Sequence, residues 1–325
     1  MNIRVLDEET IRGLIGPTEA HAEVRRAFEQ LARGEVVLPE VMFLGLEEAQ
    51  GEVHVKGGYL DGAPVYCIKE ASGFARNREK GLPTNFGVVW AFDATTGFLD
   101  SILFDNGYLT ELRTGAAGGV AADLLAKDRI ERLAVIGCGV QARYQLAAFL
   151  HIRTPGEVVA YCRSADAGSA YAREMRELHG VDVTAAASVE EAVRRSDAVI
   201  TTTTSTEPIV RSGWVEPGCH ITAMGADTPA KQELDPALFE RARVVADSLA
   251  QCLTQGEIHH GVESGTIAAD DVVELGEVAL GRGGRESDDE VTICDLTGVG
   301  VLDAAVATWV VGQAGAKQLG RTLDV

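Results

Sequence analysis

The feature that most constrains this chain is a short apolar run that breaks into a glycine-rich turn and continues as a helical pattern. The run is Leu133–Ile136, and the turn is GCGVQA over residues 137–142, of the form G-x-G-x-x-A. Gly137 permits a tight turn, Gly139 lets the backbone approach a pyrophosphate, and Ala142 allows close packing of helix on strand. Because free N–H groups at the start of a helix face phosphates, the segment predicts a dinucleotide site.

Strand-like and helical patterns alternate along the chain after this point. The strand-like runs are Leu133–Ile136, Val158–Tyr161, Val199–Thr203, His220–Met224, Val244–Ala246 and Val291–Cys294, and helical patterns lie between them at Ser169–Leu178, Val189–Arg195 and Pro236–Arg241. Such alternation predicts a parallel sheet with helices on both faces. The expected fold class is therefore α/β, with a doubly wound Rossmann sheet over residues 115–302.

The first 110 residues follow a different pattern. An amphipathic helix is expected over Thr18–Arg33, followed by β-like stretches at Val36–Leu46, Glu52–Tyr59, Pro64–Ile68, Gly87–Phe92 and Phe98–Phe104. This predicts an α+β domain with an antiparallel sheet over residues 1–114. An Ala/Gly-rich helix, Thr110–Leu125, links the two domains. The last helix, about Asp303–Leu319, is expected to return to the first domain, so that residues 303–325 join it.

Composition restricts the partners of the chain. Its 325 residues include 49 acids and 29 bases, which gives a formal net charge of −20. Phosphate-rich partners require a basic surface, so neither nucleic acid nor an anionic membrane is expected. No apolar run approaches the roughly 18 residues of a membrane span, and the first residues lack the apolar core of a signal peptide. A cytoplasmic location is therefore expected.

The cysteines and histidines suggest no metal site. The six cysteines are Cys67, Cys138, Cys162, Cys219, Cys252 and Cys294, and they form no C-x-x-C pair. Because four of them lie in or next to apolar runs, we expect buried free thiols and no disulfide. His259 and His260 lie on a helical stretch, where adjacent side chains point about 100° apart. We therefore expect them on the surface, without a shared metal ion.

Three charged residues are candidates for chemistry. Lys69 follows the apolar stretch Tyr66–Ile68, so its ammonium either enters a cleft that holds an anionic group or is solvated at the sheet edge. Arg113 can clamp a carboxylate through two hydrogen bonds, or pair with Glu111 or another acid. Asp227 follows a predicted Rossmann strand, at the edge where ligands bind such sheets. That position equally suits the N-cap of a helix.

Five segments occur together in an order that resembles the ornithine cyclodeaminase/mu-crystallin family. They are Lys69, DNGYLTELRTGAA over 105–117, GCGVQAR over 137–143, MGADTPAKQEL over 224–234 and DLTG over 295–298. The resemblance covers nearly the whole chain. The family includes ornithine cyclodeaminase, archaeal-type alanine dehydrogenase, imine and ketimine reductases, and ectoine-utilisation cyclodeaminase-like proteins.

The resemblance implies a homodimer formed through the N-terminal domain, NAD(P) on the Rossmann domain, and a small imino or amino acid in the cleft between domains. It implies that Lys69 is the active-site lysine, that Arg113 binds the substrate carboxylate, and that Asp227 is the acid–base group beside the reacting nitrogen. The cofactor residues that it implies are Thr84, Gly137, Gly139, Val140, Gln141, Lys231 and Thr297.

The chain departs from ornithine-using members of the family at two places. Those members carry an early Arg, absent from the corresponding residues 38–43, and a Glu thirteen residues before the lysine, where this chain has Lys56. A cation there repels a diamine and attracts an anion, by about 1–4 kcal/mol at about 4 Å. Lys56, Lys69 and Arg113 together could neutralise two carboxylates. This favours a dicarboxylic imine such as iminosuccinate over ornithine, and over pyruvate with ammonia.

The sequence does not decide whether the cofactor carries a 2′-hydroxyl or a 2′-phosphate. The residues that bear on this choice are AYCRS over 160–164, at the end of the second Rossmann strand. It lacks the acid that usually accepts the ribose hydroxyls in NAD enzymes. Arg163 could bind a 2′-phosphate, which would suit NADP(H), or stack on the adenine. Likeness to the dicarboxylate-imine reductases of the family favours NAD(H).

The main hypothesis is an NAD(P)H-dependent oxidoreductase of amino-acid metabolism that reduces a C=N bond to an α-amino acid, with iminosuccinate to aspartate as the best fit. One alternative is a cyclodeaminase, which oxidises, cyclises with loss of ammonia and re-reduces without net redox change. A second is a mu-crystallin-like protein that binds cofactor and ligand with little turnover. The presence of Asp227 argues against this last alternative.

Overall fold

The computed structural model describes residues 2–324, which form two compact units. The first unit contains the residues up to Arg113 and those from Val299 onward, and the second is Thr114–Gly298. The first domain predicted from the sequence ends at residue 114 and resumes at residue 303. Helix α3 (Tyr108–Leu125) carries the chain from the first unit into the second.

The first unit contains an eight-stranded sheet in the order β18-β1-β7-β6-β5-β4-β2, with β3 also paired to β4. The strands are β1 (Asn2–Asp7), β2 (Val36–Val37), β3 (Met42–Leu46), β4 (Gly51–Leu60), β5 (Val65–Phe74), β6 (Asn85–Asp93), β7 (Leu99–Phe104) and β18 (Arg321–Asp324). Their pairings are antiparallel except that of β1 with β7. Strands β1 and β18, from opposite ends of the sequence, pair with each other and were not predicted.

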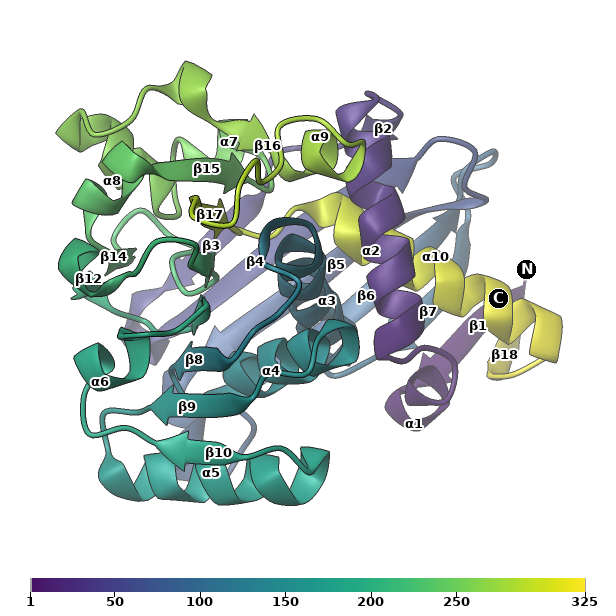
Figure 1. The fold of residues 1–325 in the computed structure, drawn as a ribbon. Helices are drawn as coiled ribbons and strands as arrows, with labels where there is room; N and C mark the ends of the chain where they lie inside the picture. Colours follow the sequence, from purple (N-terminus) through teal and green to yellow (C-terminus); the bar gives the residue numbers. More distant parts are fainter. Residues whose placement is uncertain (1, 325) are drawn as a thin grey trace. The chain divides into compact units, whose positions relative to one another are not determined.

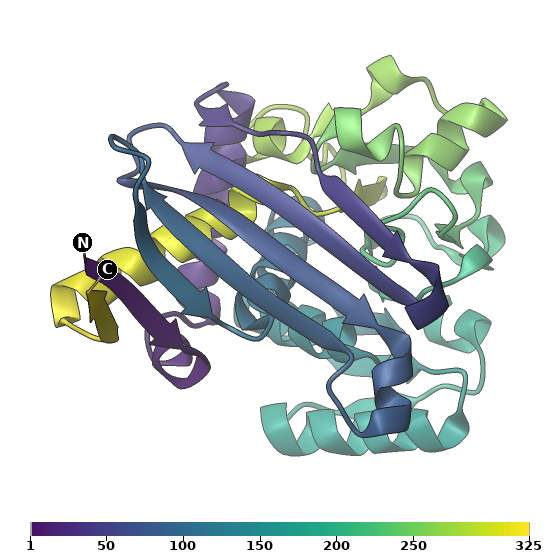
Figure 2. The same ribbon diagram turned by 180° about the vertical axis from the view of Figure 1, so that it is seen from behind.

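Two long helices of the first unit pack on one face of this sheet. They are α2 (Pro17–Ala32) and α10 (Gly300–Lys317), and the short α1 (Glu8–Arg12) follows β1. Helix α10 contacts α2, β4 and β5, and Figures 1 and 2 show both helices on the same side of the strands. Ala20, Val24 and Phe28 of α2 are fully buried at this contact layer. The core of the unit therefore lies between these helices and the sheet.

The second unit contains eight parallel strands in the order β10-β9-β8-β11-β13-β17-β15-β16. These strands are β8 (Arg132–Ile136), β9 (Glu157–Tyr161), β10 (Val183–Ala185), β11 (Ala198–Thr201), β13 (His220–Ala223), β15 (Ala242–Ala246), β16 (Val273–Glu274) and β17 (Val291–Asp295). The short strands β12 (Thr206–Val210) and β14 (Gln232–Leu234) pair separately. The helices are α4 (Val140–Ile152), α5 (Ala165–His179), α6 (Val189–Val193), α7 (Leu249–Cys252), α8 (Ile258–Ser264) and α9 (Leu275–Ala279). The predicted Rossmann fold is confirmed.

Strand β8 shows why its sequence is apolar throughout. Leu133 and Val135 belong to one hydrophobic cluster, with Phe149 of α4, while Ala134 and Ile136 belong to the cluster on the other face. All four strand residues are fully buried. A strand covered by helices on both faces cannot alternate apolar with polar residues, and this one does not.

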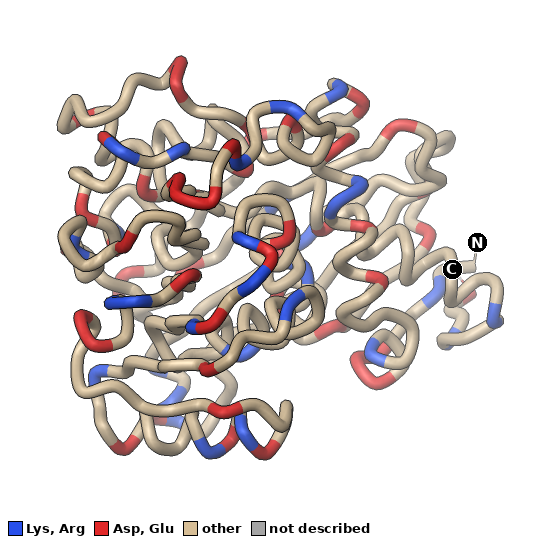
Figure 3. The backbone as a smooth tube through the Cα atoms, in the orientation of Figure 1, with Lys and Arg blue, Asp and Glu red and all other residues tan. Residues whose placement is uncertain are grey.

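No helix among the described residues is both long enough and apolar enough to cross a bilayer. Lys and Arg residues are interspersed with Asp and Glu over both units (Figure 3). The charges are mixed over both units. Binding of a polyphosphate backbone depends instead on basic residues gathered on one face.

Candidate active site

In the first unit, Lys69 of β5 and Arg113 of α3 converge on Asp303 of α10. Lys69 Nζ and Arg113 Nε donate to the same atom, Asp303 Oδ1, at 3.0 and 2.9 Å. All three side chains are buried, with exposed fractions of 2%, 5% and 3%. Asp303 Oδ2 is also buried and has no hydrogen-bond partner among the described residues. The cluster therefore keeps one carboxylate oxygen unsatisfied, a costly arrangement unless a ligand completes it.

Two glycines bring Asp303 to this position. A Cβ on Gly58 of β4 would lie 3.0 Å from Gly300 O, and one on Gly300 would overlap Gly57 O. Helix α10 can therefore begin directly against β4. Asp303 falls in the first turn of α10, where the helix dipole favours a negative charge.

Lys56 lies beside Lys69. The two residues are directly opposite each other on the antiparallel pair β4 and β5, so their side chains share one face of the sheet. Burial lowers the pKa of Lys69 to about 7, an effect that Asp303 opposes and that Arg113 and Lys56 reinforce. Burial alone would raise the pKa of Asp303, but Arg113, Lys69 and Lys56 together hold it below its ordinary value. Asp303 is thus ionised at neutral pH.

The sequence analysis did not identify Asp303 as part of the site. It left open whether Arg113 pairs with Glu111 or another acid, and the structure identifies the acid as Asp303. A signal was present, because Asp303 is the one acid in the apolar helix segment GVLDAAVATWVV over residues 300–311. A second buried acid, Asp105, accepts from the N–H of Leu109 at 2.8 Å, and burial raises its pKa.

In the second unit, the glycine turn has the shape that a pyrophosphate requires. Gly137 has a φ of +117°, which favours glycine, and its N–H donates to Tyr161 O at 2.9 Å. A Cβ on Gly139 would meet no atom within 4 Å, so the backbone there is open. Helix α4 begins at Val140, which is 47% exposed, and no side chain caps its N-terminus. The start of a helix with no side-chain cap is a position at which backbone N–H groups can bind an anion.

Arg163 lies in the loop between β9 and α5 and is exposed. The adjacent Ser164 is the N-cap of α5, and its Oγ accepts from Ala167 N at 3.4 Å. Arg163 is thus an exposed cation just after the carboxyl end of β9.

Asp227 lies in the loop after β13, and no helix begins there. The alternative interpretation as a helix N-cap is therefore wrong. Instead, Lys231 Nζ donates to Asp227 Oδ1 at 2.5 Å, and the Asp227 side chain is 46% exposed. The loop between β13 and β14 thus carries a carboxylate paired with an ammonium and accessible to solvent.

Four buried carboxylates hold the loops at the same sheet edge. Glu233 accepts from Gly225 N at 2.9 Å, Glu257 from Glu233 N at 2.7 Å, Asp295 from Glu257 N at 2.8 Å and Asp247 from Gly298 N at 2.6 Å. Burial raises the pKa of Asp295 to about 8 and that of Glu257 well above its ordinary value. None of these four buried carboxylates was predicted from the sequence to hold the loops.

Two residues predicted to bind the cofactor, Thr297 and Thr84, form hydrogen bonds within their own unit. Thr297 Oγ1 donates to Asp247 Oδ1 at 2.9 Å and accepts from Gln251 at 2.9 Å, and the residue is 4% exposed. Thr84, in the first unit, precedes β6, and its carbonyl accepts from Phe74 N at 2.7 Å.

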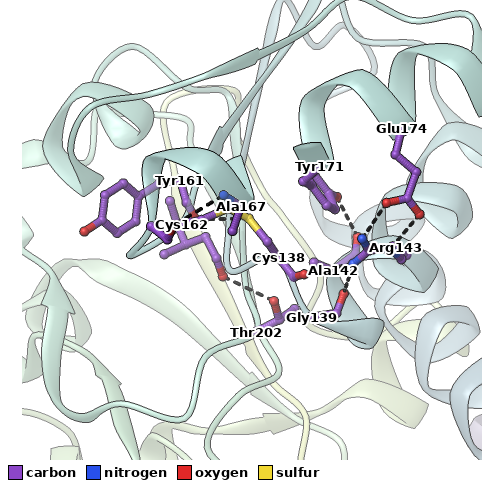
Figure 4. Close-up of a disulfide and its surroundings, with 12 residues drawn as sticks. Cys138, Gly139, Ala142, Arg143, Tyr161, Cys162, Ala167, Tyr171, Glu174 and Thr202 are labelled. Atoms are coloured by element: carbon purple, nitrogen blue, oxygen red, sulfur yellow. Dashed lines mark hydrogen bonds and ion pairs between the residues drawn. A yellow bond between two sulfur atoms is a disulfide. The ribbon is translucent and has the colours of Figure 1, made fainter. Parts of the chain in front are cut away.

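The prediction that the cysteines are all free thiols was wrong for one pair. Cys138 and Cys162 form a disulfide, with Cα atoms 5.8 Å apart (Figure 4). The reason is the pairing of β8 with β9, which places Ile136 opposite Tyr161 and so brings the next residues of both strands to one sheet edge. Cys67, Cys219, Cys252 and Cys294 are free and buried, as predicted.

The prediction that both histidines lie on the surface was wrong for His259. His259 is 7% exposed rather than on the surface, and the ring centroids of His259 and His260 lie 3.7 Å apart. With Glu263 they offer three potential ligand atoms within 4.8 Å of one another. Each ring is also held by a carbonyl, His259 Nε2 by Pro229 O at 3.1 Å and His260 Nε2 by Lys231 O at 2.9 Å. The pair therefore braces the Asp227 loop.

Comparisons with known proteins agree with the motifs. Residues 3–318 match the ornithine cyclodeaminase/mu-crystallin family. A putative dehydrogenase of Rhizobium meliloti is 39% identical over 325 residues, which cover 99% of each chain. The structure of an archaeal alanine dehydrogenase dimer with bound NAD matches with a TM-score of 0.93 at 37% identity, covering 100% of this chain and 99% of that one. The iminosuccinate reductase of Paracoccus denitrificans in complex with NAD⁺ matches with a TM-score of 0.92 at 33% identity, covering 100% of both chains. The resemblance inferred from the motifs is confirmed, and the chain belongs to the ornithine cyclodeaminase/mu-crystallin family.

Proposed function

We propose that this protein is an NAD(P)H-dependent oxidoreductase that reduces the C=N bond of a small imino acid to an α-amino acid, with iminosuccinate as the preferred substrate. The observation that carries the proposal is the buried cluster of Lys69 and Arg113 on Asp303, with the half-buried Lys56 directly opposite Lys69. Relatives of this chain are named as an alanine dehydrogenase and an iminosuccinate reductase, which agrees with the reaction class.

The charge of the cluster favours a dicarboxylate. Three cationic side chains face one paired carboxylate, so the cluster is net positive, and it stays so when Asp105 is also ionised. A ligand with two carboxylates offsets that charge, whereas the distal ammonium of a diamine adds to it. Arg113 is suited to bidentate binding of one carboxylate, with Lys69 and Lys56 near the other.

The second unit provides residues that fit a dinucleotide. Gly137 lets the turn pack against Thr202, and Gly139 leaves the backbone open. The start of α4 at Val140 and Gln141 faces the proposed pyrophosphate position. When bound, the cofactor supplies the hydride, and the protein contributes orientation and electrostatics. NADH is the expected partner, because the matched structures hold NAD or NAD⁺. Arg163 is the residue whose replacement distinguishes NADPH from NADH.

Asp227 is the proposed proton donor to the reacting nitrogen. Its carboxylate is accessible and is held by Lys231, which fixes its direction. Replacing Asp227 by Asn keeps the shape and removes the titratable proton. Turnover is expected to fall by about 10²-fold, the range for loss of a general acid, while the Kd for NADH stays near that of wild type. An unchanged kcat would assign Asp227 a structural role only.

The first unit also has a surface suited to a homodimer. On β3, Met42, Phe43, Leu44 and Leu46 are 47–55% exposed, and the sheet face turned away from α2 and α10 is seen in Figure 2. Met42, Leu44 and Leu46 alternate along the strand and so share one face, while Phe43 lies on the other, and exposed apolar groups of this kind usually mark an interface. The full chain is therefore expected to sediment as a dimer, as the archaeal relative is a dimer, and Phe43→Asp is expected to shift it toward the monomer.

The test of the function is a substrate screen with the purified full chain. NADH and NADPH oxidation are followed with oxaloacetate plus ammonia as the source of iminosuccinate, with pyruvate plus ammonia, and with a cyclic imine. Oxaloacetate without ammonia is the control for keto-acid reduction. Faster turnover of the dicarboxylic imine supports the proposal. Efficient formation of proline from ornithine would instead identify a cyclodeaminase, and binding of NADH without turnover of any substrate would identify a cofactor-binding protein.

A further inference from the structure

The six cysteines fall into two classes by exposure. Cys67, Cys219, Cys252 and Cys294 are buried, and burial raises the pKa of the Cys67 and Cys219 thiols to about 12. Cys138 and Cys162 are half-buried. Because thiol reactivity requires both access and a thiolate, only the second class is suited to exchange with solution reagents.

Each member of this pair belongs to one wall of the dinucleotide site. Cys138 is the residue between Gly137 and Gly139, and Cys162 directly precedes Arg163. They lie at the carboxyl ends of the adjacent parallel strands β8 and β9, the edge at which doubly wound sheets bind nucleotides. The Cα distance of 5.8 Å lies in the usual range for a disulfide, so the two residues can be joined without moving the strands.

The rest of the turn is held from the opposite side, as Figure 4 shows. Arg143 Nη1 donates to Cys138 O at 2.8 Å and to Gly139 O at 3.0 Å, and Arg143 pairs with Glu174 of α5. On the side of β9, the turn is joined by the Gly137 N–H to Tyr161 O bond and by the disulfide. Breaking the disulfide removes the covalent link and leaves two weaker contacts between the turn and β9, the Gly137 N–H bond to Tyr161 O and the contact of Cys138 Sγ with the same carbonyl at 3.8 Å.

We propose that Cys138 and Cys162 form a redox modification site that reacts with a low-molecular-weight disulfide, and that the oxidised form holds the glycine turn in its dinucleotide-binding shape. The thiolate of one cysteine attacks the small disulfide, forms a mixed disulfide and releases one thiol. The second cysteine then attacks the protein sulfur of the mixed disulfide and releases the second thiol. The protein dithiol is oxidised by two electrons and the small disulfide is reduced to two thiols.

The consequence is a cofactor affinity that depends on the redox state. In the oxidised form the turn is already ordered, and the open backbone at Gly139 and the uncapped start of α4 remain accessible. In the reduced form, ordering of the turn is an additional cost of binding, which lowers affinity. This inference rests on the dinucleotide site proposed above.

The experiment measures NADH affinity of the full chain by fluorescence titration after equilibration with oxidised or reduced glutathione. Oxidised wild type is expected to bind NADH about fivefold more tightly than reduced wild type. Cys138→Ser and Cys162→Ser should each bind like the reduced wild type in reduced glutathione, and the double variant Cys138→Ser/Cys162→Ser, which cannot form a mixed disulfide at this site, should do so under both conditions. Cys67→Ala, which changes a buried thiol of the first unit, is the matched control and should keep the full redox response.

A second measurement does not depend on any variant. Alkylation of the native wild-type protein, read by mass spectrometry of peptides, should label Cys138 and Cys162 after reduction, neither after oxidation, and the buried four in neither state. Equal NADH affinity in the two redox states, tighter binding by the reduced form, or failure of oxidised glutathione to protect the pair would overturn the inference. Absence of NADH binding in both states would overturn the dinucleotide site itself, and the inference with it.

Discussion

The two units each bury a group of charges, and the two groups are satisfied in different ways. In the first unit, Lys69 and Arg113 meet one carboxylate, Asp303, through side-chain contacts. In the second, Glu233, Glu257, Asp295 and Asp247 accept from backbone N–H groups of neighbouring loops. The first group combines two cations with one acid, and one buried oxygen in each group, Asp303 Oδ2 and Asp295 Oδ1, has no hydrogen-bond partner among the described residues. The second is made of acids alone, supported by peptide groups.

This difference separates a binding site from a scaffold. Burying a charge costs free energy, which is recovered by an opposite charge or by hydrogen bonds. In the second unit, backbone hydrogen bonds offset part of this cost, and burial still raises the pKa of Asp295 and Glu257, which favours their neutral forms. In the first unit two cations share one carboxylate, so we expect an anionic ligand to add to their compensation. Four predictions test this distinction.

The largest effect is expected for Arg113→Ala. The change removes the bidentate cation and one of the two partners of Asp303 Oδ1. We expect kcat/KM for the dicarboxylic imine to fall by roughly 10²–10³-fold, the range for loss of one partner of a buried charged pair. Steady-state kinetics measures this, and the Kd for NADH is the control. A loss shared equally with NADH affinity would contradict a substrate-specific role.

The second prediction concerns pH. Burial lowers the pKa of Lys69 to about 7, so the free enzyme loses this positive charge as the pH rises through 7. If the charge binds a carboxylate, the affinity for succinate, an unreactive dicarboxylate, should fall about tenfold per pH unit above that value. Calorimetry between pH 6 and pH 9 (about 25 °C) measures the slope. Lys69→Arg keeps the charge and should flatten the slope; an equally steep decline in this variant would place the titrating group elsewhere.

The third prediction sharpens the role of Lys56, which lies opposite Lys69. Lys56→Glu should lower kcat/KM for the dicarboxylic imine at least about tenfold, or about 1.4 kcal/mol, by exchanging attraction for repulsion. Lys56→Gln should give a smaller loss, since it removes the charge without reversing it. Turnover of pyruvate with ammonia should change much less, because the second carboxylate is missing. Equal losses on both substrates would show that Lys56 does not recognise that carboxylate.

The smallest effect is expected for the scaffold acid Asp295. Its folded-state pKa of about 8 lies above the ordinary value of 3.8, so the folded protein keeps a proton that the unfolded chain releases. Its contribution to stability is therefore greatest at low pH and is lost as the pH rises through 8. Asp295→Asn should gain stability relative to wild type between pH 5 and pH 7, by no more than about 1.4 kcal/mol per pH unit. Urea unfolding at each pH measures the gap, and a constant gap would show that Asp295 does not titrate as inferred.

Local patterns in the sequence were sufficient for much of this protein. The run Leu133–Ile136 predicts a buried strand, and the turn after it predicts the open backbone at Gly139, because both depend on residues adjacent in the chain. The alternation of strands and helices likewise predicts the Rossmann fold. The proximity of Lys56 and Lys69 follows from the register of consecutive antiparallel strands, which is also a short-range property.

Tertiary structure alone decided the contacts between distant segments. Asp303 is 234 residues from Lys69 and 190 from Arg113, and it reaches them because α10 returns to pack on β4 and β5. The disulfide between Cys138 and Cys162 depends on β8 and β9 being neighbours in the sheet. Residue patterns specify which groups an element carries, but strand order and helix docking determine which of those groups meet, and these depend on packing across the whole unit.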